Sequence, residues 1–112
     1  MSQLRSHVST HILDAATGRP AGGVAVSLLD VDGTEIAAGR TDADGRVSDL
    51  GPELLERGTY RLRFATGEYF AGTSRDTFYP VVSIDFEVTD PAQHYHVPLL
   101  LSPFAYSTYR GS

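Results

Sequence analysis

Histidine and arginine are the side chains of this sequence best suited to acid–base chemistry near neutral pH. The four histidines form two pairs near the chain ends, His7 with His11 and His94 with His96, and Arg46 follows an Asp-Gly turn. A neutral imidazole has an unperturbed pKa of about 6.5 and can take a proton from water. A guanidinium is always charged and suits the stabilisation of an oxyanion. Together these residue types suit proton transfer beside a developing negative charge.

Each of these residues also has an ordinary structural interpretation. A lone strand histidine is more often a satisfied or half-exposed side chain, and we assign His7 and His94, at expected strand starts, to structure. Arg46 alone would be a solvated hairpin residue. His94 and His96 are two potential zinc ligands, but no third ligand lies nearby in the sequence, so we predict no metal site.

The elements that must position these side chains are mostly strands, because the apolar residues recur with a period of two. Several short strands separated by Gly- and Pro-containing turns predict an all-β antiparallel sandwich. Helix is scarce: residues 52–58 are the first candidate, with Pro early and Gly after it, and residues 67–71 are the second. We expect strands near 6–14, 23–30, 35–41, 46–48, 59–65, 81–89, 94–101 and 104–110.

Three of the expected strands, 7–14, 94–101 and 104–110, have a second face that lacks the charged residues of a solvated surface. One face of each is suited to the core. The opposite face mixes His, Ser and Tyr with Leu, Pro and Ala. Since a solvated face would normally carry charged residues, we expect this second face to be buried by a partner subunit, a ligand, or both. The expected core residues are Val8, Thr10, Ile12, Tyr95, Val97, Leu99, Leu101, Phe104 and Tyr106.

Composition limits the class of protein. A chain of 112 residues with 41% hydrophobic residues fits one globular domain, 1–112. The net charge of −5 comes without a basic stripe, so nucleic acid and membrane are not expected as partners. Cysteine and lysine are absent, which excludes a disulfide framework and a Schiff-base lysine. No signal peptide or membrane-length apolar run is visible, so we expect a cytoplasmic protein.

Several segments resemble one family. Residues 94–112, which end in Tyr-Arg-Gly-Ser, closely resemble the end of 5-hydroxyisourate hydrolases, enzymes of the transthyretin-like family. Residues 9–14 and 18–21 are similar to the family's N-terminal signature, 41–46 to its arginine-bearing turn, and 78–80 to its aromatic-proline segment. The terminal segment is highly specific, whereas similar patterns over 18–64 recur in many prealbumin-like domains.

The resemblance implies a fold, an assembly and an activity. The fold is an eight-stranded transthyretin-like antiparallel β-sandwich with one short helix, assembled as a homotetramer around a central channel. The activity is hydrolysis of 5-hydroxyisourate to 2-oxo-4-hydroxy-4-carboxy-5-ureidoimidazoline, on the route from urate to allantoin, without a cofactor.

The resemblance also carries over to particular residues. It implies catalytic roles for His11, Arg46 and His96, with Ser112 supplying the terminal group nearby, and it implies substrate binding by His11, Arg46 and Tyr109. Which histidine is the general base stays open. Arg110 is expected to point away from the site and serve structure.

Two other functions remain as alternatives. The first is a transthyretin-type carrier that binds a small aromatic anion in the same channel. The carrier branch has a lysine at the position of His11, a glutamate at that of Arg46, and no Tyr-Arg-Gly-Ser end, so this sequence follows the enzyme. The second is a non-catalytic adhesion module, which predicts a secretion signal or neighbouring domains.

Overall fold

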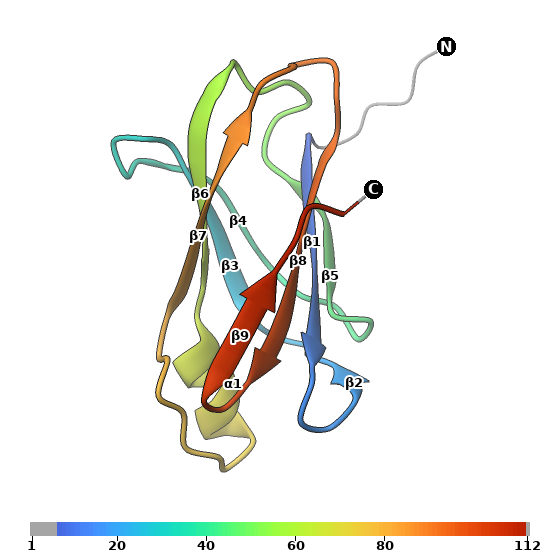
Figure 1. Cartoon of the computed structure of the whole chain (residues 1–112), viewed down its shortest axis with the longest axis vertical. Coiled ribbons are helices and arrows are strands. Elements are labelled where there is room, and N and C mark those ends of the chain that lie inside the picture. The colour runs from blue at the N-terminus through green and yellow to red at the C-terminus, as the bar shows by residue number, and fades with distance from the viewer. Residues whose placement is uncertain (1–6, 112) are drawn as a thin grey trace.

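Two β-sheets face each other across the core in the computed structural model, which describes residues 7–111 (Figure 1). Sheet A contains β1 (Val8–Asp14), β2 (Arg19–Pro20), β5 (Arg46–Leu50), β8 (Tyr95–Ser102) and β9 (Ala105–Thr108). Sheet B contains β3 (Ala25–Leu29), β4 (Glu35–Arg40), β6 (Gly58–Phe64) and β7 (Val82–Val88), in the order β4-β3-β6-β7. In sheet A, β8 lies between β1 and β9, while β1 also pairs with β5 and β2.

The predicted all-β sandwich is confirmed, and all eight expected strands are present. The structure adds β2, a strand of only two residues. One strand pair departs from the predicted antiparallel arrangement, since β1 and β8 run parallel. A parallel pair needs a long crossover, and here the whole of sheet B lies between the two strands in the sequence. Alternation along a strand shows its two faces but not its direction. The sequence pattern therefore could not predict that β1 and β8 run parallel.

The single short helix among the described residues is α1 (Thr66–Gly72), at the second predicted position. The first prediction, a helix over 52–58, is wrong. The backbone N–H of Leu55 donates to Nδ1 of His7 at 2.8 Å, and the N–H of His7 donates to the carbonyl of Pro52 at 3.2 Å. Leu55 itself is buried in the core. These contacts hold the segment in an irregular conformation against the start of β1. A helix over 52–58 would not make these two hydrogen bonds to His7.

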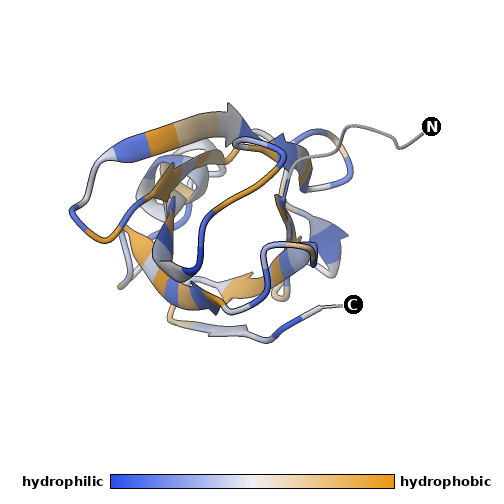
Figure 2. Ribbon diagram, turned by 90° about the horizontal axis from the view of Figure 1, so that it is seen from above, coloured by the Kyte–Doolittle hydropathy of each residue, from blue (hydrophilic) through white to orange (hydrophobic). Residues whose placement is uncertain are grey.

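The core lies between the sheets, and apolar residues alternate into it from both of them (Figure 2). Alternation is expected because successive strand side chains point to opposite faces. The helix adds Phe70, which is fully buried. The largest fully buried side chains of the strands are Ile12, Leu28, Leu50, Leu62, Phe64, Leu99 and Leu101.

The predicted core positions Phe104, just before β9, and Tyr106, on β9, are wrong. Phe104 is 68% exposed and Tyr106 is 40% exposed. β9 forms the edge of sheet A, and all four of its residues are exposed. Tyr106 instead packs edge-on against Tyr79, with ring centroids 5.1 Å apart.

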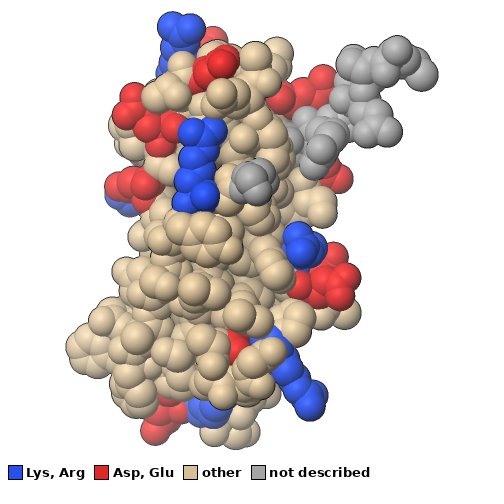
Figure 3. Space-filling model, turned by 45° about the vertical axis from the view of Figure 1, so that its right-hand side comes forward, with Lys and Arg blue, Asp and Glu red and all other residues tan. Residues whose placement is uncertain are grey.

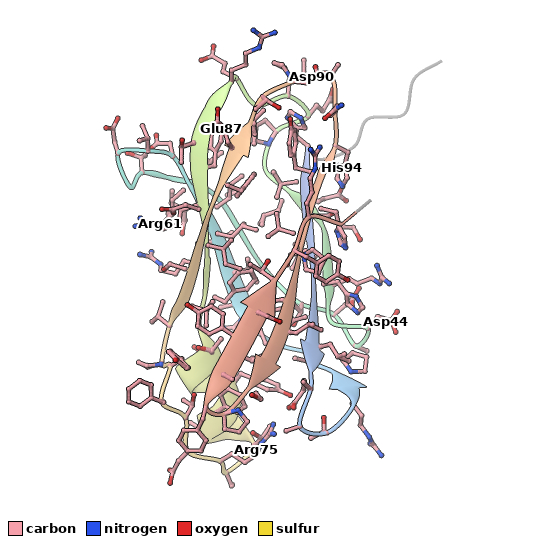
Figure 4. All side chains as sticks on the ribbon, in the orientation of Figure 1. Asp44, Arg61, Arg75, Glu87, Asp90 and His94 are labelled. Atoms are coloured by element: carbon pink, nitrogen blue, oxygen red, sulfur yellow. The ribbon has the colours of Figure 1, made fainter. Side chains whose placement is uncertain are left out.

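Asp14 is fully buried at the end of β1, where its carboxylate also accepts the backbone N–H groups of Ala16 and Thr17 in the following turn. Its carboxylate accepts hydrogen bonds from Arg75 Nη2 at 2.5 Å and from the Tyr69 hydroxyl at 2.8 Å. Arg75 also lies over the ring of Phe70 at 5.0 Å and is seen beside α1 in Figure 4. Burial alone would raise the pKa of Asp14, but the bonds from Arg75, Tyr69 and the Thr17 backbone outweigh burial and lower it. This cluster ties the end of β1 to α1.

Replacing Asp14 by alanine is therefore expected to lower the free energy of unfolding by roughly 3 kcal/mol, because it leaves a partly buried arginine unpaired. The folded pKa lies below the unfolded value of about 3.9, so this stabilisation is complete at neutral pH and is lost as pH falls below that value. Urea unfolding at fixed protein concentration measures it. Asp85→Ala, which breaks the exposed Arg61–Asp85 pair, is the control and should cost under about 1 kcal/mol. Equal losses in the two variants would contradict this account.

Candidate active site

The outer face of sheet A brings the predicted histidines and arginine onto three neighbouring strands. On one side of β1, His11 pairs with Arg46 of β5. On the other side, Ser9 of β1 pairs with His96 of β8, and His11 pairs with Pro98. Directly paired residues have Cβ atoms about 5 Å apart on the same face of a sheet. The register therefore gathers His11, Arg46 and His96, as predicted.

The turn before β5 places Arg46 beside His11. Gly45 has a φ of +74°, a left-handed conformation that glycine adopts without strain. Its carbonyl accepts the N–H of Ile12 at 2.7 Å, and a Cβ at this position would overlap the carbonyl oxygen of Ile12. The carboxylate of Asp42 then accepts the N–H of Arg46 at 3.0 Å. The Asp-Gly turn therefore packs closely against β1. Arg46 follows the turn and lies on the outer face of sheet A.

A hollow of about 200 Å³ lies between β5 and the start of β8. It is lined by Ser9, Thr10, Arg46, Val47, Ser48, His94 and His96. Figure 4 shows His94 near the end of sheet A where β8 begins. His11 does not line this hollow, although it neighbours Arg46 in the sheet.

The Ser9 hydroxyl stands between two imidazoles, a feature that sequence reasoning missed. Its Oγ lies 2.8 Å from Nδ1 of His96 and 2.7 Å from Nε2 of His94. Ser9 had been placed on the same face as His11, but the hydrogen bonds depend on the register of β1 against β8. The spacing of His94 and His96 was the available signal, because residues two apart share a strand face. His94, assigned to structure, therefore belongs to the hollow.

The surroundings of His96 favour its neutral form. Its pKa lies below the usual value, first because of burial and then because of the nearby His94, Arg46 and His11. A neutral imidazole beside a guanidinium can accept a proton while the guanidinium holds an anion. The arrangement suits a reaction in which water is deprotonated and an oxyanion forms.

The tail lies along β8 and does not fray within the described residues. The N–H of Gly111 donates to the carbonyl of His96 at 2.9 Å. A Cβ at Gly111 would overlap Cδ2 of the His96 ring, so a larger residue fits there only if the ring or the tail moves. Arg110, for which we predict a structural role, stacks on Tyr95 at 4.7 Å and donates to Gln93 at 2.9 Å.

The two other predicted site residues do not line the hollow. Tyr109 is 58% exposed and borders a neighbouring cavity of about 290 Å³, which His96 also lines. Ser112 lies outside the described residues. The tail therefore reaches His96 through the backbone of Gly111, whereas Tyr109 lies beside the adjoining cavity.

Charged side chains are sparse in the middle of the outer face of sheet A and gather toward its margins (Figure 3). This agrees with the uncharged second face expected from the sequence. Among residues 7–111, no group of three or more His, Cys, Asp or Glu side chains is arranged to hold a metal ion. Nor does this part of the chain contain a helix long and apolar enough to cross a membrane.

Comparison with known proteins places this geometry in a family. Residues 8–111 match the model of the HIUase/Transthyretin family. A 5-hydroxyisourate hydrolase of Caulobacter vibrioides is 50% identical over 114 residues, which covers 96% of this chain and 99% of that protein. The chain belongs to the HIUase/transthyretin family. Strands β1 to β9 and α1 are its version of the transthyretin-like sandwich, as the sequence predicted.

Solved structures of the family resemble the chain closely in both of its branches. The 5-hydroxyisourate hydrolase of Klebsiella pneumoniae has a TM-score of 0.87 and 43% identity, covering 94% of this chain and 98% of that one. The transthyretin of Sparus aurata also has a TM-score of 0.87, with 36% identity and coverage of 96% and 97%. The backbone alone therefore does not separate the hydrolase from the transthyretin, and the residues of the hollow must do so.

Proposed function

We propose that this protein hydrolyses 5-hydroxyisourate to 2-oxo-4-hydroxy-4-carboxy-5-ureidoimidazoline, in the degradation of urate to allantoin. The carrying observation is that the fold gathers His96, His11 and Arg46 on one face, with His96 held neutral. The hydrolases among its relatives, such as that of Caulobacter vibrioides, support the same reaction. The experiment adds purified protein to freshly formed substrate and follows the loss of its ultraviolet absorbance.

In the proposed mechanism, water attacks the carbonyl carbon of the cyclic amide. One imidazole, His96 or His11, takes the proton of the attacking water as general base. The carbonyl oxygen becomes an oxyanion, which the guanidinium of Arg46 stabilises. The C–N bond then breaks, and the nitrogen that leaves receives a proton from the imidazolium. The new carboxyl group keeps the second proton of the water and releases it to solvent as a carboxylate forms. The imidazole returns to its neutral form, so atoms and charge balance without any cofactor.

Tyr109 and Ser112 complete the proposed site from the tail. Tyr109 is proposed to hydrogen-bond or stack on the substrate ring, since its exposed phenol borders the cavity that shares His96. Ser112 is proposed to supply its terminal group to the reaction, because Gly111, the residue before it, donates its N–H to the carbonyl of His96.

We further propose a cytoplasmic homotetramer. The uncharged middle of sheet A and the uncovered edge strand β9 are surfaces that a second copy would bury. Light scattering at micromolar concentration should give four times the 12.1 kDa mass of the chain. A monomer mass under those conditions would contradict the assembly.

A further inference from the structure

The Ser9 hydroxyl sits 2.8 Å from His96 Nδ1 and 2.7 Å from His94 Nε2, on strands that the register holds side by side. We infer that Ser9 is a positioning residue, which fixes the tautomer of His96 and links it to His94 in one hydrogen-bonded unit. The expected effect of Ser9 on turnover rests on the proposed function, in which His96 is a candidate general base.

A serine hydroxyl has only one proton to donate. Ser9 therefore donates to one imidazole and accepts an N–H from the other. In the first arrangement, His96 Nδ1–H donates to Ser9, Ser9 donates to His94 Nε2, and the lone pair of His96 stands on Nε2. In the second arrangement every proton is reversed, and His96 carries its proton on Nε2. Only the first leaves His96 able to take a proton from water, because its Nδ1 faces Ser9 in both.

Protonation of His94 switches the unit from the first arrangement to the second. A charged His94 carries N–H on both nitrogens, so its Nε2 donates to Ser9. Ser9 must then donate to His96 Nδ1, and the His96 proton moves to Nε2. One proton is added overall, at His94, yet His96 loses its lone pair on Nε2 while remaining neutral. A charged His94 would therefore leave Nε2 of His96 without the lone pair that takes the proton of water.

Other ionisable groups lie around the two imidazoles and must be separated from His94 in any test. Near His94 and His96 they are His7, His11 and Arg46. The adjoining cavity, which His96 also lines, adds Asp85, Glu87, Tyr95, Tyr109 and Arg110. A substitution at His94 alone is therefore required to assign an effect to this residue.

The direct test is the tautomer of His96 in the free protein, read at pH 7.5 from long-range proton–nitrogen NMR spectra of the imidazole rings. We expect one dominant form, with the proton on Nδ1, in the wild type and in Ser9→Thr, which keeps the hydroxyl. Ser9→Ala should give a mixture of both forms. Ser83→Ala, an exposed serine of β7 in the other sheet, is the matched control and should match the wild type.

The kinetic arm uses 5-hydroxyisourate. Ser9→Ala should lower kcat by about 10- to 100-fold with little change in KM, as removal of an orienting partner does, and Ser9→Thr should restore most of it. His94→Gln places a non-titrating acceptor near the position of Nε2, so the acid limb of its kcat profile should move to lower pH.

Two results would overturn the inference: an unchanged His96 tautomer in Ser9→Ala, or an acid limb in His94→Gln identical to that of the wild type. If the wild type itself fails to hydrolyse the substrate, the proposed function fails. The tautomer measurement needs no substrate, so it still decides whether Ser9 sets the state of His96.

Discussion

Replacing His96 by alanine is expected to slow the hydrolysis of 5-hydroxyisourate by about 10²–10⁴-fold, the usual contribution of general acid–base catalysis. The ring lines the hollow beside Arg46, and its lowered pKa keeps it neutral near pH 7. Its Nδ1 is taken up by Ser9, so Nε2 is the nitrogen available to a water molecule. The loss should appear in kcat, measured at saturating substrate.

His11→Ala is expected to cause a loss of the same order, because His11 pairs with Arg46 and faces the same surface. The control is His7→Ala, at a buried histidine that supports Leu55 from the start of β1. That variant should lower the urea midpoint while the folded protein keeps its kcat within a few-fold. If His96→Ala or His11→Ala retains near-wild-type turnover, that residue has no catalytic role.

The second large effect is expected from the smallest substitution, Gly111→Ala. The added methyl group would overlap Cδ2 of His96 and approach the ring of Pro98. Either the imidazole turns away from Ser9 or the tail lifts from β8, and each moves a proposed site residue by about 1 Å. A misplacement of that size can cost about 10²-fold in rate. We expect a loss of this order in kcat/KM with little change in the urea midpoint, since the tail lies at the surface.

Gly72→Ala is the matched control for this variant. An added Cβ there meets no atom within 4 Å, so activity should stay at the wild-type level. Wild-type turnover by Gly111→Ala would show that the tail does not fix His96.

The sequence predicted the strands well because most of them have one buried face. Val82, Ile84 and Val88 alternate with polar residues, and this pattern has no helical equivalent. The strands of the site were equally readable, since Val97 and Leu99 alternate with His96 and Pro98. The resemblance then supplied the site residues, and the register of β5, β1 and β8 brings three of them together.

What escaped prediction depends on contacts between distant parts of the chain. Asp14 caps the turn that follows β1, and only the fold brings Arg75 and Tyr69 to its carboxylate. Ser9 and His94 are separated by 85 residues, and no local pattern shows that one hydroxyl joins two imidazoles. The predicted helix over 52–58 is absent for a similar reason, because the backbone N–H of Leu55 donates to the ring of the distant His7. Periodicity identifies faces, whereas these features require register and strand direction.

The most direct test of the proposed function is turnover itself. 5-Hydroxyisourate is generated from urate with uricase, purified protein is added at a small fraction of the substrate concentration, and the ultraviolet absorbance is followed. The account predicts decay at a rate proportional to protein concentration, many substrate molecules consumed per chain, and a rate reduced by about 10²–10⁴-fold in His96→Ala. Decay at the spontaneous rate would contradict the account, and binding of the substrate without its decay would indicate a carrier.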